Sequence, residues 1–217
     1  MNKALIISQA EAYVVEQLGA DTTGHDWWHS DRVRNTAGVI AEMENADRLV
    51  CELAALLHDV ADEKLNDSKE AGLDKVSGWL SSHLDNQEQT SHIMNIIGTM
   101  SYSGGGGQPM ATLEGRVVQD ADRLDALGAV GIARVFAFSG AKGRPLHIPG
   151  LPPRDESLKE EYRDYSKGTA VNHFYEKLLK LKDSMNTSYG RTIAEERHAF
   201  MLSYLEQFYK EWGSNHE

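Results

Sequence analysis

Residues 47–64 read DRLVCELAALLHDVADEK and organise the rest of the chain. The apolar positions in this segment recur every three or four residues, which is typical of a helix with one face in the core: Val50, Leu53, Ala54 and Leu57. We expect this helix to end at His58 and Asp59. An imidazole and a carboxylate side by side are costly to bury without a partner, and a metal ion would satisfy both.

Composition excludes several classes of partner. The chain has 217 residues, of which 41% are hydrophobic and 25% charged, as in ordinary globular domains. With 22 Lys and Arg against 33 Asp and Glu, the net charge of −11 disfavours nucleic acid polymers and anionic membranes. An anionic substrate must therefore be a small molecule held by a few cations or by a metal.

The single cysteine, Cys51, excludes an internal disulfide. The N-terminal residues contain no long apolar run, so we expect neither a signal peptide nor a membrane span. These features together predict a cytoplasmic protein.

Apolar spacing predicts helices through most of the chain, and strand-like alternation is absent from the sequence. The expected helices cover residues 3–18, about 25–44, 47–59, 66–85, a segment around 93–97, 111–139, 171–185 and 193–212. The sequence contains no internal repeat and no interdomain linker. We therefore predict a single all-α domain over residues 1–217.

Two helices carry polar residues that a surface role does not explain well. His29 shares a helical face with Val33 and Ala37, so it is expected to point inward. A lone inward histidine is more often a hydrogen-bonded core residue than a metal ligand. Residues 111–139 place Asp122 and two other aspartates in an otherwise apolar helix, although a single carboxylate is weak support for a site.

Two loops interrupt the helical pattern. Residues 101–109 contain four consecutive glycines, but no Gly-Lys-Ser/Thr follows, so a phosphate-binding loop is not indicated. A mobile surface loop is the preferred interpretation, and gating is a role that such a loop could have. Residues 140–153 are rich in proline and predict a long irregular connection.

The order His29, then His58-Asp59, then Asp122 resembles the HD-domain superfamily of metal-dependent phosphohydrolases. Residues 119–136 and the segment around 173–178 are similar to one bacterial branch of hydrolases in this family. The resemblance implies an all-α helical bundle with long C-terminal helices. Its HD core would cover about residues 20–140, and a C-terminal helical extension would cover 155–213.

The resemblance implies a divalent metal ion bound by His29, His58, Asp59 and Asp122. Two imidazoles and two carboxylates suit Mn²⁺, Fe²⁺, Co²⁺, Ni²⁺ or Mg²⁺ better than a thiolate-preferring metal. One ion per chain is expected, because relatives in this branch often carry a histidine near the position of Met100 and this chain does not.

The resemblance also suggests catalytic and substrate-binding residues. Asp62, four residues after the histidine of the HD pair, would position or deprotonate the attacking water. Arg32 and Lys64 would bind phosphate and assist catalysis, and Arg123 would bind phosphate. The alternative for these three cations is an ordinary surface ion pair. Asp125 would orient a ligand histidine.

Three functions are compatible with these residues. The leading one is a phosphohydrolase of small nucleotides, releasing pyrophosphate from a nucleoside triphosphate or phosphate from a monophosphate. A dinuclear phosphodiesterase or oxygenase would add His83 and His92 as ligands of a second metal ion. A nucleotide-binding regulator would keep the fold without turnover. The long C-terminal helices could also form a homodimer.

Overall fold

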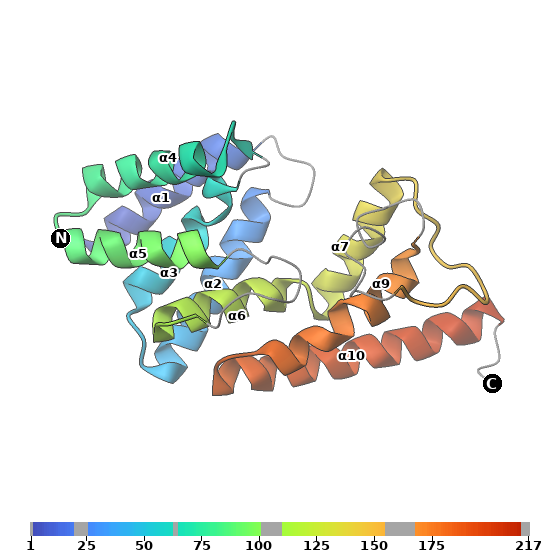
Figure 1. Cartoon of the computed structure of the whole chain (residues 1–217). Helices are drawn as coiled ribbons and strands as arrows, with labels where there is room; N and C mark the ends of the chain where they lie inside the picture. Colours follow the sequence, from blue (N-terminus) through green and yellow to red (C-terminus); the bar gives the residue numbers. More distant parts are fainter. Residues whose placement is uncertain (1, 20–25, 63–64, 101–109, 155–167, 214–217) are drawn as a thin grey trace. The chain divides into compact units, whose positions relative to one another are not determined.

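The structure is a computed structural model and describes residues 2–19, 26–62, 65–100, 110–154 and 168–213. All regular secondary structure in these residues is helical, which confirms the predicted all-α class (Figure 1). The chain divides into two compact units, Met1–Asp122 and Arg123–Glu217. A single domain over residues 1–217 stays a prediction.

The first unit is built around one buried helix, α3, in which every residue from Leu49 to Leu57 is buried. Helices α1, α2 and α5 pack against α3, and α4 packs on α5 and on η1, the 3₁₀ turn that follows α3 (Figure 1). The bounds are α1 Lys3–Leu18, α2 Trp27–Glu44, α3 Arg48–Leu57, η1 Asp59–Ala61, α4 Lys69–His83 and α5 Gln87–Thr99. Helix α6 runs from Leu113 to Asp125. The predicted central helix is confirmed.

Short polar side chains fix where the central helices begin and end. Asp47 Oδ1 accepts hydrogen bonds from Leu49 N at 2.9 Å and from Val50 N at 3.3 Å, which caps α3. Helix α2 ends at Asn45, whose left-handed φ of 59° turns the chain out of the helix. The connection between the two helices is therefore short, and α2 packs along α3.

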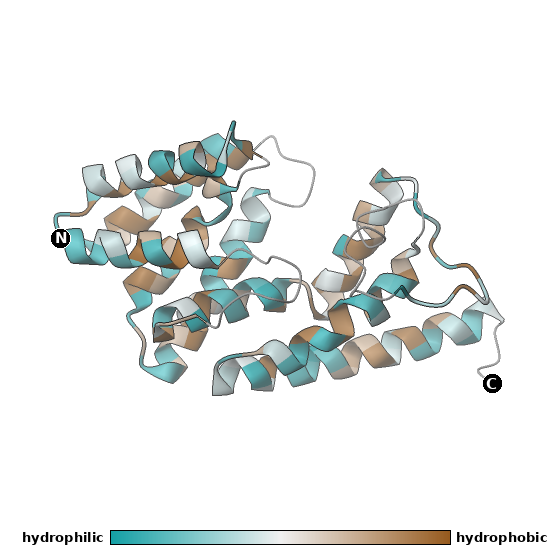
Figure 2. Ribbon diagram, viewed as in Figure 1, coloured by the Kyte–Doolittle hydropathy of each residue, from teal (hydrophilic) through white to brown (hydrophobic). Residues whose placement is uncertain are grey.

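The outer helices are amphipathic, and Figure 2 shows hydrophilic and apolar residues alternating along α4 and α5. The buried face of α1 consists of Ile6, Ala10, Val14 and Leu18. Two further apolar residues of this helix, Leu5 and Val15, are 55% and 45% exposed. The spacing of apolar residues in α1 allowed either of two faces to be buried. The face that packs against α3 is the buried one.

In the second unit, α7 and the 3₁₀ segment η4 pack against α10, and α9 packs against α7 and η4. The bounds are α7 Gly128–Ala141, α9 Ala170–Glu176, η4 Leu178–Ser184 and α10 Ser188–Trp212. The pattern over 171–185 was expected to form one long helix, and that expectation is wrong. Lys177 leaves the helical region with φ −134° and ψ −58°. A spacing of three residues, as between Leu178 and Leu181, fits an α-helix and a 3₁₀ helix equally well.

The pattern over 111–139 is also broken, between α6 and α7. Gly128 has a positive φ of 73°, and a Cβ at Gly131 would lie 2.2 Å from the carbonyl oxygen of Ala126. Side chains at these two positions would therefore clash or strain the turn. Among the described residues, no single helix is long and apolar enough to cross a membrane, and only α6 and α7 taken together across their break reach that length and composition.

Residues 142–154 are irregular, as the prolines predicted, and this segment is attached to the start of α9. Ala170 N donates to the carbonyl of Pro145 at 3.1 Å, and Val171 N donates to the carbonyl of Leu146 at 3.0 Å. Asn172 Nδ2 donates to the carbonyls of Leu151 and Pro152 at 3.2 and 3.1 Å. The segment is therefore fixed by hydrogen bonds to its backbone carbonyls, although it has no regular structure.

Candidate metal centre

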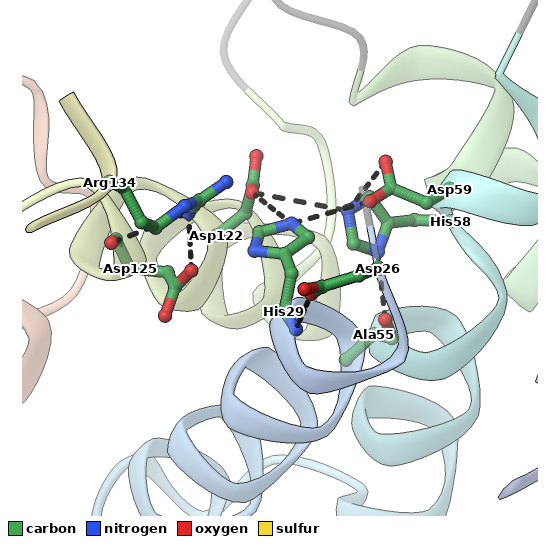
Figure 3. A network of polar contacts seen from close by, with 8 residues as sticks. All are labelled: Asp26, His29, Ala55, His58, Asp59, Asp122, Asp125 and Arg134. Atoms are coloured by element: carbon green, nitrogen blue, oxygen red, sulfur yellow. Dashed lines mark hydrogen bonds and ion pairs between the residues drawn. The ribbon is translucent and has the colours of Figure 1, made fainter. Parts of the chain in front are cut away.

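His29 is positioned by the start of helix α2. Asp26 caps this helix, because its Oδ1 accepts a hydrogen bond from His29 N at 2.8 Å (Figure 3). His29 lies in the first turn and is buried, together with Val33 and Ala37 on the same face. The predicted inward orientation of His29 is confirmed.

His58 is the residue at which helix α3 ends. Its Nδ1 lies 2.8 Å from the carbonyl oxygen of Ala55, one turn earlier (Figure 3). A carbonyl oxygen can only accept, so Nδ1 carries a proton, and in the neutral tautomer this leaves the lone pair on Nε2. The sequence therefore presents Nε2 of His58, and not Nδ1, to its neighbours.

Asp59 and Asp122 contact the same two imidazoles. His29 Nε2 lies 3.4 Å from Asp59 Oδ2 and 3.4 Å from Asp122 Oδ1. His58 Nε2 lies 3.2 Å from Asp59 Oδ1 and 3.9 Å from Asp122 Oδ1. In Figure 3 the two imidazoles lie between the two carboxylates. Residues from α2, the end of α3, η1 and α6 thus converge on one point within the first unit.

These distances fit the donor set of a metal ion. Around one ion with bonds of about 2.0–2.2 Å, neighbouring ligand atoms lie roughly 3.0–3.4 Å apart and opposite ones about 4.2 Å apart. Ligand atoms of His29, His58 and Asp59 all lie within 4.8 Å of one another, so these three residues could hold a metal ion. Asp122 contacts both imidazoles but lies outside that group of three.

Asp122 is held in its charged form by the two imidazoles. Burial alone would raise the pKa of this carboxyl group. The hydrogen bond with His29 and the charges of His58 and His29 outweigh burial and the opposing charge of Asp59, so the pKa of Asp122 is lowered. A carboxylate is the form that a cation requires.

The other predicted site residues lie in different surroundings. Asp62 follows η1, where its backbone N–H donates to the carbonyl of Asp59 at 3.0 Å. Arg32 is partly exposed in α2, one turn after His29. Arg123 Nη1 donates to the carbonyl of Ser184 within the second unit. Their catalytic and phosphate-binding roles stay predictions.

Lys64 and the whole glycine-rich loop at 101–109 lie outside the described residues. Asp125, expected to orient a ligand histidine, forms an ion pair with Arg134 in the second unit (Figure 3). Its assignment to the metal centre stays a prediction.

His83 and His92, the candidate ligands of a second metal ion, have other partners. His83 Nδ1 lies 2.7 Å from the carbonyl oxygen of Trp79, and its ring stacks on Trp79 at 4.2 Å. His92 Nε2 lies 3.1 Å from Thr112 Oγ1. Within the described part of the chain, neither histidine joins a group of three potential metal ligands. One ion per chain stays a prediction.

Two residues that the sequence patterns did not indicate contact the turn carrying Asp59. Asn66 Nδ2 donates to the carbonyls of Val60 and Asp62 at 2.9 and 2.8 Å. A Cβ at Gly72 of α4 would lie 2.6 Å from the carbonyl oxygen of Ala61. An Asn shortly after the HD pair and a glycine inside a helix were the available signals, but neither specifies a contact.

Comparison with known proteins agrees with this geometry. A model of the HD domain family matches residues 27–127. The Bacillus subtilis protein YpgQ is 41% identical over 205 residues, covering 94% of this chain and 92% of YpgQ. The crystal structure of an HD-superfamily hydrolase from Bacillus thuringiensis aligns with a TM-score of 0.80 at 46% identity, covering 99% of this chain and 100% of that chain. The crystal structure of YpgQ in complex with ADP aligns with a TM-score of 0.77 at 42% identity, covering 97% of each chain.

Proposed function

Because the chain belongs to the HD-domain superfamily of hydrolases, we propose that it is a metal-dependent phosphohydrolase acting on small nucleotides. The observation that carries this proposal is the convergence of His29, His58, Asp59 and Asp122 from four segments of the chain. The hydrolase class follows from family membership. The metal dependence, the nucleotide substrate and the roles of individual residues are our inferences.

We assign His29, His58, Asp59 and Asp122 as the ligands of one divalent ion, with Mn²⁺, Fe²⁺, Co²⁺, Ni²⁺ and Mg²⁺ as candidates. When bound, such an ion polarises a phosphoryl oxygen and lowers the pKa of a coordinated water. The hydrogen bond from His58 Nδ1 to the carbonyl of Ala55 orients this ring before any ligand binds. Its Nε2 is therefore already directed at the centre.

We assign proton transfer and phosphate binding to residues that lie near the metal ligands in the sequence. Asp62, directly after η1, is assigned to accept a proton from the attacking water. Arg32, one turn after His29 on α2, is assigned to bind phosphate oxygens, for which a guanidinium offers a planar pair of donors. Lys64 is assigned a second positive charge for the same phosphate.

Two observations support a nucleotide as the substrate. The related protein YpgQ was crystallised in complex with ADP. The net charge of −11 disfavours polymeric nucleic acid, whereas a small anion needs only a metal ion and a few cations. We propose that the reaction releases pyrophosphate from a nucleoside triphosphate or phosphate from a monophosphate.

A nucleotide panel with added Mn²⁺, in which phosphate and pyrophosphate release are measured separately, tests this proposal. We expect selective release from one nucleotide class by the wild-type protein and loss of that activity in His58→Ala. His83→Ala is the matched control, because His83 also ends a helix and its Nδ1 also lies against a backbone carbonyl, at 2.7 Å. His83→Ala should keep the activity.

Two results would contradict the proposal. One is a metal-loaded wild-type protein that hydrolyses no phosphoester or phosphoanhydride across the panel, and binding of nucleotides without hydrolysis would then identify a regulator. The other is wild-type activity in His58→Ala, which would place the reaction outside the centre of His29, His58, Asp59 and Asp122.

A further inference from the structure

The turn that carries Asp59 is stabilised by a single amide side chain. Asn66 Nδ2 donates to the carbonyl of Val60 at 2.9 Å and to the carbonyl of Asp62 at 2.8 Å. An amide nitrogen has two protons, so these two bonds use its full donor capacity. The two acceptors lie on either side of Ala61, the last residue of η1, so one side chain fixes the end of the turn.

Helix α4 contacts the same turn through backbone atoms. A Cβ added at Gly72 would lie 2.6 Å from the carbonyl oxygen of Ala61 and 2.8 Å from Asn66 Nδ2. Both distances are too short for any side chain, so α4 approaches η1 closely only because residue 72 is glycine. The start of α4 is itself fixed, because Ser68 Oγ accepts a hydrogen bond from Ala71 N at 3.1 Å.

A second glycine in α4 shows that this contact is specific. Gly78 lies in the same helix, and a Cβ there would meet no heavy atom within 4 Å. Glycine is less favourable than alanine inside a helix. At Gly72 the contact with η1 excludes a Cβ, whereas at Gly78 there is space for one.

The backbone of the turn transmits any displacement to the candidate ligands. Ala61 N donates to the carbonyl of His58 at 3.3 Å, and Asp62 N donates to the carbonyl of Asp59 at 3.0 Å. The Asp59 carboxylate lies only 3.2–3.4 Å from the two imidazole nitrogens. A shift of a few tenths of an ångström at Ala61 would therefore change the geometry around Asp59.

We infer that Asn66 and Gly72 are positioning residues for the metal centre, which hold the carboxylates of Asp59 and Asp62 where the cation and the water require them. The metal part of this inference rests on the proposed function. Its physical basis is that residues behind metal ligands set ligand orientation, and their loss typically weakens metal binding by about 10–100-fold.

Gly72→Ala and Gly78→Ala form a matched pair for the test, with two readouts that do not depend on hydrolysis. Calorimetric titration with Mn²⁺ should show affinity weakened by about tenfold or more in Gly72→Ala and unchanged in Gly78→Ala. In the metal-free proteins, amide hydrogen exchange at Ala61 and Asp62 should accelerate in Gly72→Ala alone. Wild-type affinity and exchange in folded Gly72→Ala would overturn the inference.

Asn66→Ala provides a second test if Gly72→Ala fails to fold. The substitution removes both hydrogen-bond donors without adding a charge near the candidate ligands. Mn²⁺ affinity should be weaker in folded Asn66→Ala than in the wild-type protein. Unchanged or tighter Mn²⁺ binding in Asn66→Ala would overturn the inference.

These measurements separate the two proposals. Mn²⁺ binding that is weakened in Gly72→Ala, in a wild-type protein that hydrolyses no nucleotide, would refute the proposed function and retain the positioning role. Equal Mn²⁺ affinity in Gly72→Ala and wild type, with nucleotide hydrolysis intact, would refute the positioning role alone.

Discussion

The carboxylate of Glu176, which is fully buried, accepts three hydrogen bonds from Arg154. Arg154 Nε and backbone N donate to Oε1 at 2.9 and 3.0 Å, and Nη2 donates to Oε2 at 2.8 Å. Gly168 lies against the same guanidinium, since a Cβ there would be 2.8 Å from Nη2. This ion pair joins the end of the irregular segment 142–154 to helix α9.

Removing the charge of Glu176 should destabilise the second unit. In Glu176→Gln the Arg154 guanidinium, with a side chain only 10% exposed, loses the charge of Glu176, and breaking a buried pair costs about 3–5 kcal/mol. Urea unfolding at neutral pH measures this loss. The control is Glu206→Gln, which breaks the exposed Glu206–Lys210 pair and should cost no more than about 1 kcal/mol. Equal losses in the two variants would contradict the buried-pair assignment.

The same pair should make the wild-type protein sensitive to acid. Burial raises the pKa of Glu176, but the hydrogen bonds and charge of Arg154 outweigh burial and lower it. The folded state therefore binds this proton at lower pH than the unfolded state, so the stabilisation is present above the unfolded pKa and is lost as pH falls below it. The stability difference between wild type and Glu176→Gln should shrink as pH falls below about 4.5.

His173 should add a second pH dependence, at higher pH. Burial, followed by the charge of Lys177, lowers the pKa of His173 from 6.5 to about 4, with Glu176 opposing. The unfolded state gains its proton first, so folding stability is complete above about pH 6.5 and falls as the pH decreases toward 4. His173→Gln should reduce the slope of unfolding free energy against pH in this interval. An identical slope in wild type and variant would show that His173 titrates normally.

The cap of helix α2 should matter for metal binding as well as for stability. Asp26→Ala removes the acceptor for His29 N, and Asn86→Ala removes the matching cap of α5, where Asn86 Oδ1 accepts from Glu88 N at 3.0 Å. Each substitution should lower stability by about 1 kcal/mol. Only Asp26→Ala should weaken Mn²⁺ binding, because the first turn of α2 carries His29. A fall in Mn²⁺ affinity in both variants would point to a general loss of stability.

The first unit should depend strongly on its central helix. Leu53 of α3 is completely buried, and Leu53→Ala should cost about 2–5 kcal/mol in unfolding free energy. Leu5→Ala, at an exposed position of α1, should change it by no more than about 0.5 kcal/mol. Circular dichroism during urea unfolding compares the two. A small effect of Leu53→Ala would mean that the surrounding helices can close the cavity.

The predictions that were confirmed concern the faces of single helices. The three- and four-residue spacing in α3 and the inward face of α2 with His29 were confirmed, because a continuous helix fixes which residues share a face. The 3₁₀ segment at Leu178–Ser184 and the break before Gly128 were not foreseen. Their residues satisfy helical spacing, and only backbone conformation distinguishes the alternatives.

The contacts of the candidate site, in contrast, join helices that are far apart in the sequence. Spacing within α6 could not show that Asp122 lies 3.4 Å from His29, because these residues belong to helices far apart in the chain. Family resemblance supplied that pairing. It did not supply Asn66 or Gly72, whose importance depends on how closely α4 approaches η1. Contacts of this kind depend on tertiary packing, which local sequence patterns do not specify.

The convergence of His29, His58, Asp59 and Asp122 has a consequence for loop-closure entropy. Folding of the first unit already closes the long chain segments between these residues, at an entropic cost that grows slowly with segment length. An arriving cation would therefore meet preassembled donors and would not have to order the chain itself. A short peptide carrying only His58 and Asp59 should bind the same ion far more weakly than the folded protein does.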